Sequence, residues 1–437
     1  MRDGFGMTNN TEMDSKISER AIARGLTLAG ALLLALLGLA PTAWQHEWAW
    51  VARFAIFGAL GLWMANSRFE ILRLLGVTIV LLFIANQALS PFLMARLQDK
   101  EYVTLGANID RRIKLVGDVM PGIEGVQHVT TDAKGFRTTL PVDYQKKPAG
   151  TYRVFAIGAS TTEQIYLDDR KTWTHLLQGD LAAAMRTRVE VVNTGVSGLR
   201  SPHHLATLNH IAPYQPDLVL ILMGANDWNH QILEAMDDSR HGPGRWWKAM
   251  NYPDTALVFL SRQIRAAIRR ADAAPAGEPA SRKAEEFDGS YYSRQNDSLS
   301  RPQRAYPGEI KPGPDYAAAA QQLVAACGRL KLRCIFLTQP TAYDAAIEPA
   351  LKRRLWMTPP GVNFTLSLEQ MAQFARAYNR QLLDTVRSQG GEACDVAPAF
   401  APTTQYFYDD CHYNENGARA MAKAVQACIV AAPKPAK

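Results

Sequence analysis

Four short polar blocks carry the residues of this 437-residue sequence that are best suited to chemistry. They are GAST with Ser160, NTGVSG ending at Gly198, GAND with Asn226, and DDCH with Asp409 and His412. Hydrolysis through a serine needs a base within hydrogen-bond reach, an acid that orients this base, and donors for the oxyanion that forms during acyl transfer. The blocks supply all of these groups, so they predict an acyl-transfer site.

Each of these residues has an expected role. Ser160 is the candidate nucleophile, and His412 is the candidate base because a neutral imidazole can accept the hydroxyl proton. Asp409 lies three positions before His412, so both side chains can lie on one side of a single turn. The expected oxyanion donors are the backbone amides of Ser160 and Gly198 and the side-chain amide of Asn226. Gly198 has no Cβ, which lets the backbone approach a substrate closely.

Some polar residues near these blocks admit other roles. Ser160 also begins the Ser-x-x-Glu pattern of a capping box that ends at Glu163, where hydroxyl and carboxylate satisfy free donors of the first helical turn. Ser197 is a second serine, but its context TGVSGL lacks the Gly-x-Ser-x-Gly pattern of a nucleophile elbow. Asp410 is the alternative orienting acid, and the spacing of three favours Asp409.

The remaining polar candidates are expected to be structural. His203 and His204 are adjacent, but no matching set of Asp, Glu or Cys accompanies them as in a metal site, so we expect surface histidines. Asp227 is expected to tie down the loop that carries Asn226. The sequence implies neither a metal ion nor an organic cofactor.

Apolar runs alternate with helical stretches from residue 152 onward. Strands are expected at 153–157, 189–192, 217–223 and 334–337, and helices at 172–185, 202–211, 316–330, 368–388 and 417–430. This alternation predicts a parallel sheet with helices on both faces, that is, a doubly wound α/β domain. Ligands bind beyond the carboxyl ends of the strands in such sheets, and the first three blocks each follow a predicted strand.

In this order and spacing the blocks resemble those of the SGNH (GDSL-type) hydrolase superfamily, over roughly residues 152–430. The resemblance implies an ester hydrolase with a three-layer α/β/α, flavodoxin-like fold and no cofactor. It also implies the catalytic residues Ser160, Asp409 and His412, with an oxyanion hole formed by Ser160, Gly198 and Asn226.

The first block departs from the pattern of that superfamily. Ala159 stands where the superfamily usually has an aspartate, and Thr161 replaces the common leucine. Because that aspartate is not a member of the triad, we expect the chemistry to survive while the hydrogen bonds of the loop change.

The N-terminal part of the sequence is apolar and differs from the remainder. Candidate transmembrane helices lie at 26–43, 48–65 and 74–95, within an anchor over 25–96. The first and third contain no charged side chain and are close to the roughly 20 residues that span a bilayer. Arg53 interrupts the second, although an arginine near a helix end can extend to the headgroups. About three spans are therefore expected.

The basic residues predict the orientation of this anchor. Lysine and arginine occur in the tail 1–24 and at Arg68 and Arg73 between the second and third spans, which the positive-inside rule assigns to the cytoplasm. After three crossings, the catalytic domain would face the periplasm or the exterior of the cell inner membrane. If the second segment does not cross, the domain would face the cytoplasm.

Two stretches do not follow the alternation of predicted strands and helices. Residues 97–151 are expected to contain short strands and to pack on the domain at 152–432. Residues 229–313 are rich in Pro, Ser, Ala, Gly and charge, and they are expected to form a mobile insertion because they bury little apolar surface.

The net charge of +7 is not gathered into a basic stripe, which argues against nucleic acid as a partner.

The five cysteines suit an oxidising compartment. Cys327 and Cys334 would lie on a helix and the next strand, and Cys394 and Cys411 on the two sides of a late loop, so each pair could be bridged. Spacing alone does not decide the pairing with Cys428, and reduced thiols in a cytosolic domain are the alternative.

The leading hypothesis is a membrane-anchored, serine-dependent acyl ester hydrolase that acts on an acylated glycan or lipid. An O-acyltransferase or deacetylase of a cell-envelope polysaccharide would use the same groups. The third hypothesis is a non-catalytic binding protein, because the first block departs from the pattern of the superfamily.

Overall fold

The computed structural model describes residues 63–64, 67–78, 102–116, 120–236, 284–288, 301–357 and 362–431. The chain divides into two compact units, Met1–Gln98 with Ser239–Glu278, and Asp99–Asp238 with Pro279–Lys437. In the first unit the described residues include a helical stretch at 70–78. Within the described ranges, no helix is both long and apolar enough to cross a membrane. The tail 1–24 and most of the predicted spans at 26–43, 48–65 and 74–95 lie outside these ranges.

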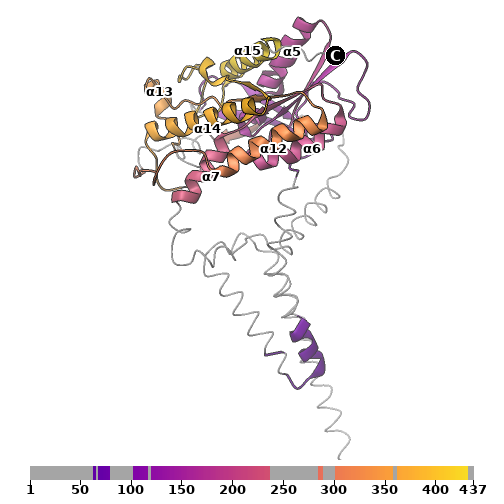
Figure 1. Cartoon of the computed structure of the whole chain (residues 1–437), viewed down its shortest axis with the longest axis vertical. Coiled ribbons are helices and arrows are strands. Elements are labelled where there is room, and N and C mark those ends of the chain that lie inside the picture. The colour runs from indigo at the N-terminus through magenta and orange to yellow at the C-terminus, as the bar shows by residue number, and fades with distance from the viewer. Residues whose placement is uncertain are drawn as a thin grey trace, which may run out of the picture. The chain divides into compact units, whose positions relative to one another are not determined.

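A five-stranded parallel sheet forms the centre of the second unit (Figure 1). Its strands are β3 (Thr151–Ile157), β4 (Arg188–Asn193), β5 (Leu218–Leu222), β7 (Cys334–Leu337) and β8 (Glu392–Cys394). Their spatial order is β4-β3-β5-β7-β8, which is the 2-1-3-4-5 order of flavodoxin-like folds. Every residue of β5 and β7 is buried, as expected for parallel strands that helices cover on both faces.

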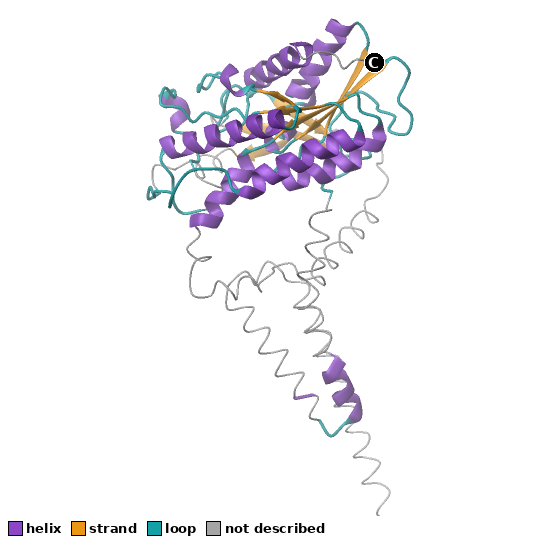
Figure 2. Cartoon of the chain, in the orientation of Figure 1, coloured by secondary structure: helices purple, strands orange, loops and turns teal. Residues whose placement is uncertain are grey.

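Helices cover this sheet on both faces, so the predicted α/β architecture is confirmed (Figures 1 and 2). One layer contains α5 (Trp173–Met185) and α15 (Glu415–Ala431), which pack on each other. The other contains α6 (Ser201–Ile211), α7 (Ala225–Met236), α12 (Pro314–Leu330) and α14 (Leu368–Ser388). Shorter helices are α4 (Ser160–Glu163), α13 (Pro349–Lys352) and the 3-10 turns η1 (Asp169–Lys171), η2 (Ala212–Tyr214) and η4 (Ala397–Ala399).

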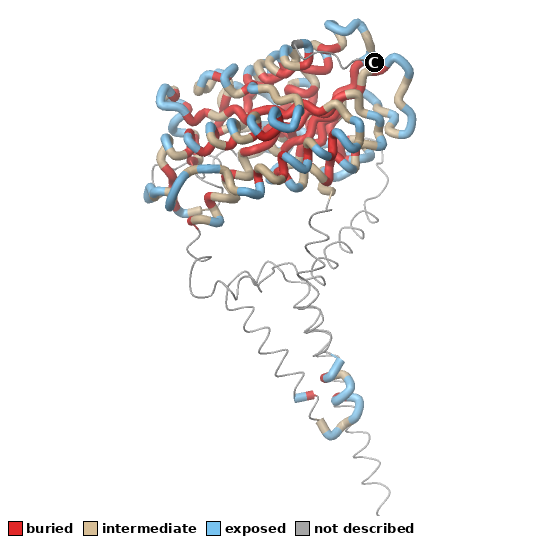
Figure 3. Tube along the Cα trace, in the orientation of Figure 1, coloured by how far each residue is buried: buried red, intermediate tan, exposed pale blue. Residues whose placement is uncertain are grey.

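Local sequence explains where these helices begin. The Thr172 hydroxyl accepts the His175 backbone N–H at the start of α5, and the Ser367 hydroxyl accepts the Gln370 N–H at the start of α14. Proline follows the N-cap Gly313 of α12, where a missing N–H costs nothing. Burial is concentrated in the sheet and on the helix faces toward it (Figure 3).

A second, smaller sheet precedes and partly interrupts the main domain. It consists of β1 (Asp110–Val116), β2 (Val126–Thr130) and β6 (Glu285–Asp288) in the order β2-β1-β6. The short strands expected within 97–151 are therefore present as β1 and β2.

The described parts of the predicted insertion at 229–313 contain regular structure, while its mobility stays a prediction. Helix α7 continues to Met236, β6 pairs in parallel with β1, and Gln303 bridges to Thr365. The strand β6 has the polar sequence EEFD and gains its order from the ladder with β1 rather than from its own burial.

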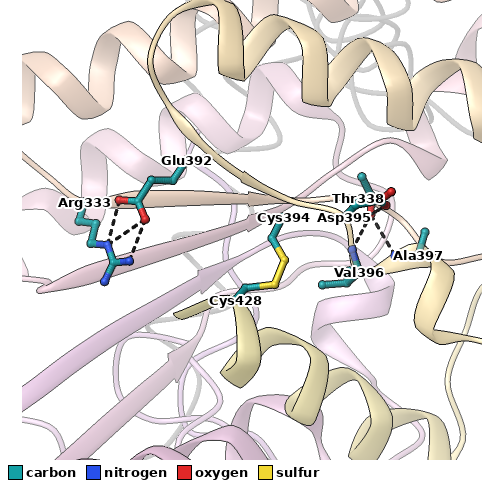
Figure 4. Close-up of a disulfide and its surroundings, with 8 residues drawn as sticks. All are labelled: Arg333, Thr338, Glu392, Cys394, Asp395, Val396, Ala397 and Cys428. Atoms are coloured by element: carbon teal, nitrogen blue, oxygen red, sulfur yellow. Dashed lines mark hydrogen bonds and ion pairs between the residues drawn. A yellow bond between two sulfur atoms is a disulfide. The ribbon is translucent and has the colours of Figure 1, made fainter. Parts of the chain in front are cut away.

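Two disulfides are formed, and one of them differs from the expected pairing. Cys327 of α12 is bonded to Cys334 of β7, as predicted. Cys394, however, is bonded to Cys428 of α15 and not to Cys411, which is a free thiol (Figure 4). The reason is the position of Cys394 at the end of β8, where its Cα lies 6.1 Å from that of Cys428.

Candidate active site

Ser160 is the first residue of α4, directly beyond the carboxyl end of β3. Its Oγ lies 2.7 Å from Nε2 of His412, although the two residues are separated by 252 positions. The N-cap of α4 is Ala159, and no side chain makes the capping bond. The Ser160 hydroxyl therefore faces the imidazole and does not cap the helix.

Glu163 does not complete a capping box either. Its carboxylate is buried, and Oε2 accepts both the backbone N–H and the hydroxyl of Ser197, each at 2.5 Å. The Ser-x-x-Glu pattern thus connects the turn that carries Ser160 to the loop that carries Gly198. The Ser197 hydroxyl donates its hydrogen to this carboxylate, whereas the hydroxyl within 2.7 Å of His412 Nε2 is that of Ser160.

Asp409 and His412 face each other across the turn that precedes α15. The Asp409 Oδ2 lies 2.8 Å from Nδ1 of His412, and Oδ1 accepts the backbone N–H groups of Cys411 and His412 at 3.1 and 2.9 Å. Since an ionised carboxylate only accepts hydrogen bonds, in the neutral imidazole Nδ1 carries the hydrogen and Nε2 accepts from the Ser160 hydroxyl.

The environment of His412 acts on its basicity in two opposite ways. Burial lowers the pKa of His412, while the negative charge of Asp409 and its hydrogen bond to the ring raise it, and the net pKa lies well above 6.5. The ring of Tyr408 lies parallel to the imidazole, with the centroids 5.6 Å apart and an angle of 9°. These contacts fix the orientation of the ring toward Ser160.

The two remaining candidates lie at the ends of the neighbouring strands. Gly198 follows β4 with φ +82°, a conformation that favours glycine, and a Cβ there would meet no atom within 4 Å. Asn226, in the first turn of α7 after β5, donates a side-chain N–H to the Leu199 carbonyl at 2.9 Å. An amide group has two N–H bonds, and among the described residues only the Leu199 carbonyl accepts from this amide, so the second hydrogen is available to a ligand.

Close packing brings the first two blocks together. A Cβ at Gly195 would lie 2.3 Å from the backbone nitrogen of Glu163, so only glycine fits this approach.

Arg137, from the segment before β3, lies on the other side of α4. Its guanidinium donates to the carbonyls of Glu163, Gln164 and Leu167 and pairs with Asp169 at 2.6 Å.

The site opens into a cavity of about 400 Å³. Its lining contains the expected site residues Ser160, Gly198, Asn226, Asp409 and His412. The other lining residues are mostly aromatic or polar: Ile165, Tyr166, Ser197, Ala225, Trp228, Asn229, Tyr343, Trp356, Tyr408, Asp410 and Cys411.

The smaller sheet contributes to the surroundings of this cavity. Buried Met120 and Tyr408 form a cluster with Leu115 of β1 and Phe287 of β6 packed against them. Tyr166, which lines the cavity, lies against Phe287 with ring centroids 5.0 Å apart. The segment before the domain and the insertion therefore both support one wall of the cavity.

Two further aspartates near the site make structural contacts: Asp410, the alternative orienting acid, and Asp227, for which such a role was expected. Asp410 accepts the backbone N–H groups of Trp356 and Met357, so it holds that loop and does not contact the imidazole ring. Asp227 accepts the backbone N–H and hydroxyl of Ser201, at 3.1 and 2.6 Å, and burial raises the pKa of Asp227 to about 6.

The expectation of two surface histidines is wrong for His204. Its side chain is buried on α6, and burial lowers the pKa of His204 to about 3, so this ring is neutral at ordinary pH. His203 instead accepts the Arg200 N–H at the start of α6. Within the described ranges, a spacing that would suit a metal ion occurs in the candidate site itself, where the ligand atoms of Asp409, Cys411 and His412 lie within 4.8 Å of one another.

Sequence reasoning missed Arg137, Tyr408, Trp228 and Asn229. A signal existed for Asn229, because it lies three positions after Asn226 on the same helix and so shares its face. The contact of Arg137 with α4 has no signal in the sequence.

The chain also matches the model of a known protein family. The model of the GDSL-like lipase/acylhydrolase family matches residues 156–420, and the chain belongs to this family. It is therefore a hydrolase that acts on ester bonds.

Solved structures also show similarity, at low sequence identity. An alpha/beta hydrolase enzyme from the metagenome of Lake Arreo, Spain, is 16% identical with a TM-score of 0.37, covering 67% of this chain and 100% of that chain. An acetylxylan esterase from Geobacillus stearothermophilus is 16% identical with a TM-score of 0.34, covering 64% and 94%. A lipase/acylhydrolase from Enterococcus faecalis is 13% identical with a TM-score of 0.34, covering 65% and 99%. No curated protein matches the chain.

Proposed function

We propose that this chain is a membrane-anchored serine esterase in which Ser160, His412 and Asp409 form the catalytic triad. The observation that carries the proposal is the 2.7 Å distance from Ser160 Oγ to His412 Nε2, with Asp409 on the opposite nitrogen of the ring at 2.8 Å. This is the arrangement that lets an imidazole take the proton of a hydroxyl while a carboxylate stabilises the imidazolium.

The reaction proceeds in two stages. In the first, the Ser160 proton moves to His412 Nε2 as Oγ bonds to the ester carbonyl carbon. The tetrahedral intermediate then expels the alcohol, which takes the proton from Nε2, and leaves an acyl group on Ser160. In the second stage a water molecule loses its proton to His412 and attacks the acyl-enzyme, and the acid leaves as the Ser160 hydroxyl re-forms.

The oxyanion of each tetrahedral intermediate requires donors. The backbone N–H groups of Ser160 and Gly198 and the second side-chain N–H of Asn226 are proposed for this role. The positive φ of Gly198 and the free hydrogen of Asn226 support the assignment. The start of α4 also favours a developing negative charge beside Ser160.

The anchor and location are proposed from the sequence. The uncharged segments 26–43 and 74–95 support membrane insertion, and the distribution of Lys and Arg supports a catalytic domain outside the cytoplasm. The disulfides Cys327–Cys334 and Cys394–Cys428 support an oxidising compartment such as the periplasm. Fusion of a periplasm-dependent reporter enzyme after residue 437 tests this: activity is expected, and an inactive but expressed fusion would contradict the orientation.

Hydrolysis is tested with the purified full-length chain on p-nitrophenyl acetate. We expect turnover by the wild type and its loss in Ser160→Ala, while unchanged turnover by the variant would refute the assignment. Adding an unacetylated envelope glycan separates hydrolysis from transfer. Release of acetate to water is expected, and faster acetylation of the glycan would identify an O-acyltransferase instead.

A further inference from the structure

The entry turn, residues 120–124 between β1 and β2, is bonded to the chain just beyond the proposed base. Its Pro121 carbonyl accepts a side-chain N–H of Asn414 at 3.0 Å. Its Gly122 carbonyl accepts the backbone N–H of Glu415 at 3.2 Å. Because Asn414 lies only two positions after the proposed base, the entry turn contacts the segment that carries this base.

The side chain of Asn414 is fully buried and connects three parts of the chain. Its amide donates to the carbonyls of Pro121 and Thr404, at 3.0 and 2.7 Å. Its Oδ1 accepts the Gly417 N–H at 3.0 Å, at the start of α15. Buried polar groups with satisfied hydrogen bonds make their surroundings rigid, so Asn414 fixes the segment that runs from His412 into α15.

The entry turn approaches Asn414 at a glycine. Gly122 has φ +76°, and a Cβ there would lie 2.5 Å from Nδ2 of Asn414. Gly125 has nearly the same φ, +75°, but a Cβ there would meet no atom within 4 Å. Both positions favour glycine for their backbone conformation, and only Gly122 is also needed for the contact with Asn414.

A second contact of the entry turn reaches the imidazole ring through Tyr408. Met120 and Tyr408, which are 5% and 4% exposed, belong to one buried apolar cluster. The ring of Tyr408 lies parallel to that of His412, and the Tyr408 backbone N–H donates to the His412 carbonyl at 3.2 Å. Met120 therefore supports a residue that lies directly against the proposed base.

We propose that the entry turn is a positioning element of the active site, which holds His412 in line with Ser160 through Asn414 and Tyr408. Residues 120–124 do not line the cavity, so they act through these two residues and not on the substrate. This inference rests on the proposed esterase function. It makes the segment before the α/β domain a part of the active site, although the family match begins only at residue 156.

Gly122→Ala and Gly125→Ala form the matched pair, and their steady-state kinetics with p-nitrophenyl acetate are compared in the full-length chain. Both substitutions place a side chain at a positive φ, so both strain the backbone. Only Gly122→Ala displaces Asn414. We expect its kcat to fall by roughly tenfold or more with little change in KM, because a misplacement of about 1 Å can cost up to about a hundredfold. Gly125→Ala should keep the wild-type kcat.

Met120→Ala and Met120→Leu test the second contact without changing the backbone. Met120→Ala removes packing from Tyr408 and should lower kcat with little change in KM. Met120→Leu keeps the apolar volume and should recover most of the rate. Val126→Ala is the control, because Val126 is an exposed residue of β2 outside this cluster, and its kcat should stay that of the wild type.

A wild-type kcat in folded Gly122→Ala, or in folded Met120→Ala, would overturn the positioning role and leave the esterase proposal intact. Equal losses of kcat in Gly122→Ala and Gly125→Ala would also overturn it, because backbone strain alone would then explain them. If Gly122→Ala does not fold, the Met120 variants decide. If the wild type hydrolyses no ester, the proposed function fails and the positioning role fails with it.

Discussion

The Glu163 carboxylate holds Ser197 by two hydrogen bonds of 2.5 Å, one from the backbone N–H and one from the hydroxyl. Glu163 is the last residue of the helix that begins with Ser160, and Ser197 is the neighbour of Gly198. The contact therefore sets the distance between the proposed nucleophile and one proposed oxyanion donor. Glu163 is a positioning residue, because it acts through these two segments.

Replacing Glu163 tests this positioning role. Glu163→Ala is expected to lower kcat by up to about a hundredfold with little change in KM, because misplacement by about 1 Å is enough for such a loss. Glu163→Gln retains an acceptor and should recover most of the rate. Steady-state kinetics with p-nitrophenyl acetate measures both. A drop in thermal stability of Glu163→Ala without any fall in kcat would show a structural role only.

Arg137 supports the same helix from the opposite side. Arg137→Ala removes the cation paired with the buried Asp169 carboxylate and the side-chain donor of three backbone carbonyls, so a loss of about 3–5 kcal/mol in the free energy of unfolding is expected. The matched control is Arg111→Ala, whose ion pair with Glu285 is exposed and worth at most about 1 kcal/mol. Urea unfolding followed by tryptophan fluorescence compares them, and equal losses would contradict this account.

The pH dependence of hydrolysis follows from His412. The base must be neutral, so the rate falls as the pH falls and the ring becomes protonated. Asp409 holds the pKa of His412 well above 6.5, which places the midpoint of this fall above that value. Asp409→Asn removes the charge and should move the midpoint to lower pH while lowering kcat by orders of magnitude. A wild-type rate that stays flat down to about pH 5 would contradict His412 as the base.

The disulfide pairing can be read directly by peptide mapping without reduction. A peptide containing Cys394 is expected to be linked to one containing Cys428, with Cys411 as a free thiol. Cys428→Ser should cost about 3–4 kcal/mol of stability, because the bridge closes a loop of 34 positions. Cys411→Ser is the control and should retain the linked peptide. A Cys394–Cys411 peptide in the wild type would contradict the structure.

The fold was predictable where the sequence carries its own local signal. The strand at 334–337 and the helix at 368–388 were expected with the bounds they have, because a short apolar run and a serine N-cap define them. Strands β6 and β8 were missed because EEFD and EAC contain no apolar run. Their order comes from pairing with β1 and β7, which are distant in the sequence.

In the candidate site too, the residues with a signal in the sequence were predicted, and the contacts that depend on tertiary packing were not. Ser160, Gly198 and Asn226 were predicted together because parallel strands end at a common edge of the sheet. The contact of Glu163 with Ser197 and the disulfide partner of Cys394 were not predicted, because both depend on which side chains the fold brings together. Ser197 was excluded from nucleophilic attack by its motif, and in the structure its hydroxyl contacts Glu163 while Ser160 contacts His412.

Covalent labelling of the full-length chain with a serine-directed fluorophosphonate, followed by peptide mapping, tests the central claim most directly. The account predicts a label on Ser160 that persists in Ser197→Ala, weakens in His412→Ala and disappears in Ser160→Ala. Both serines line the cavity, so the probe can reach either one. A label on Ser197, or undiminished labelling and turnover in Ser160→Ala, would contradict the account.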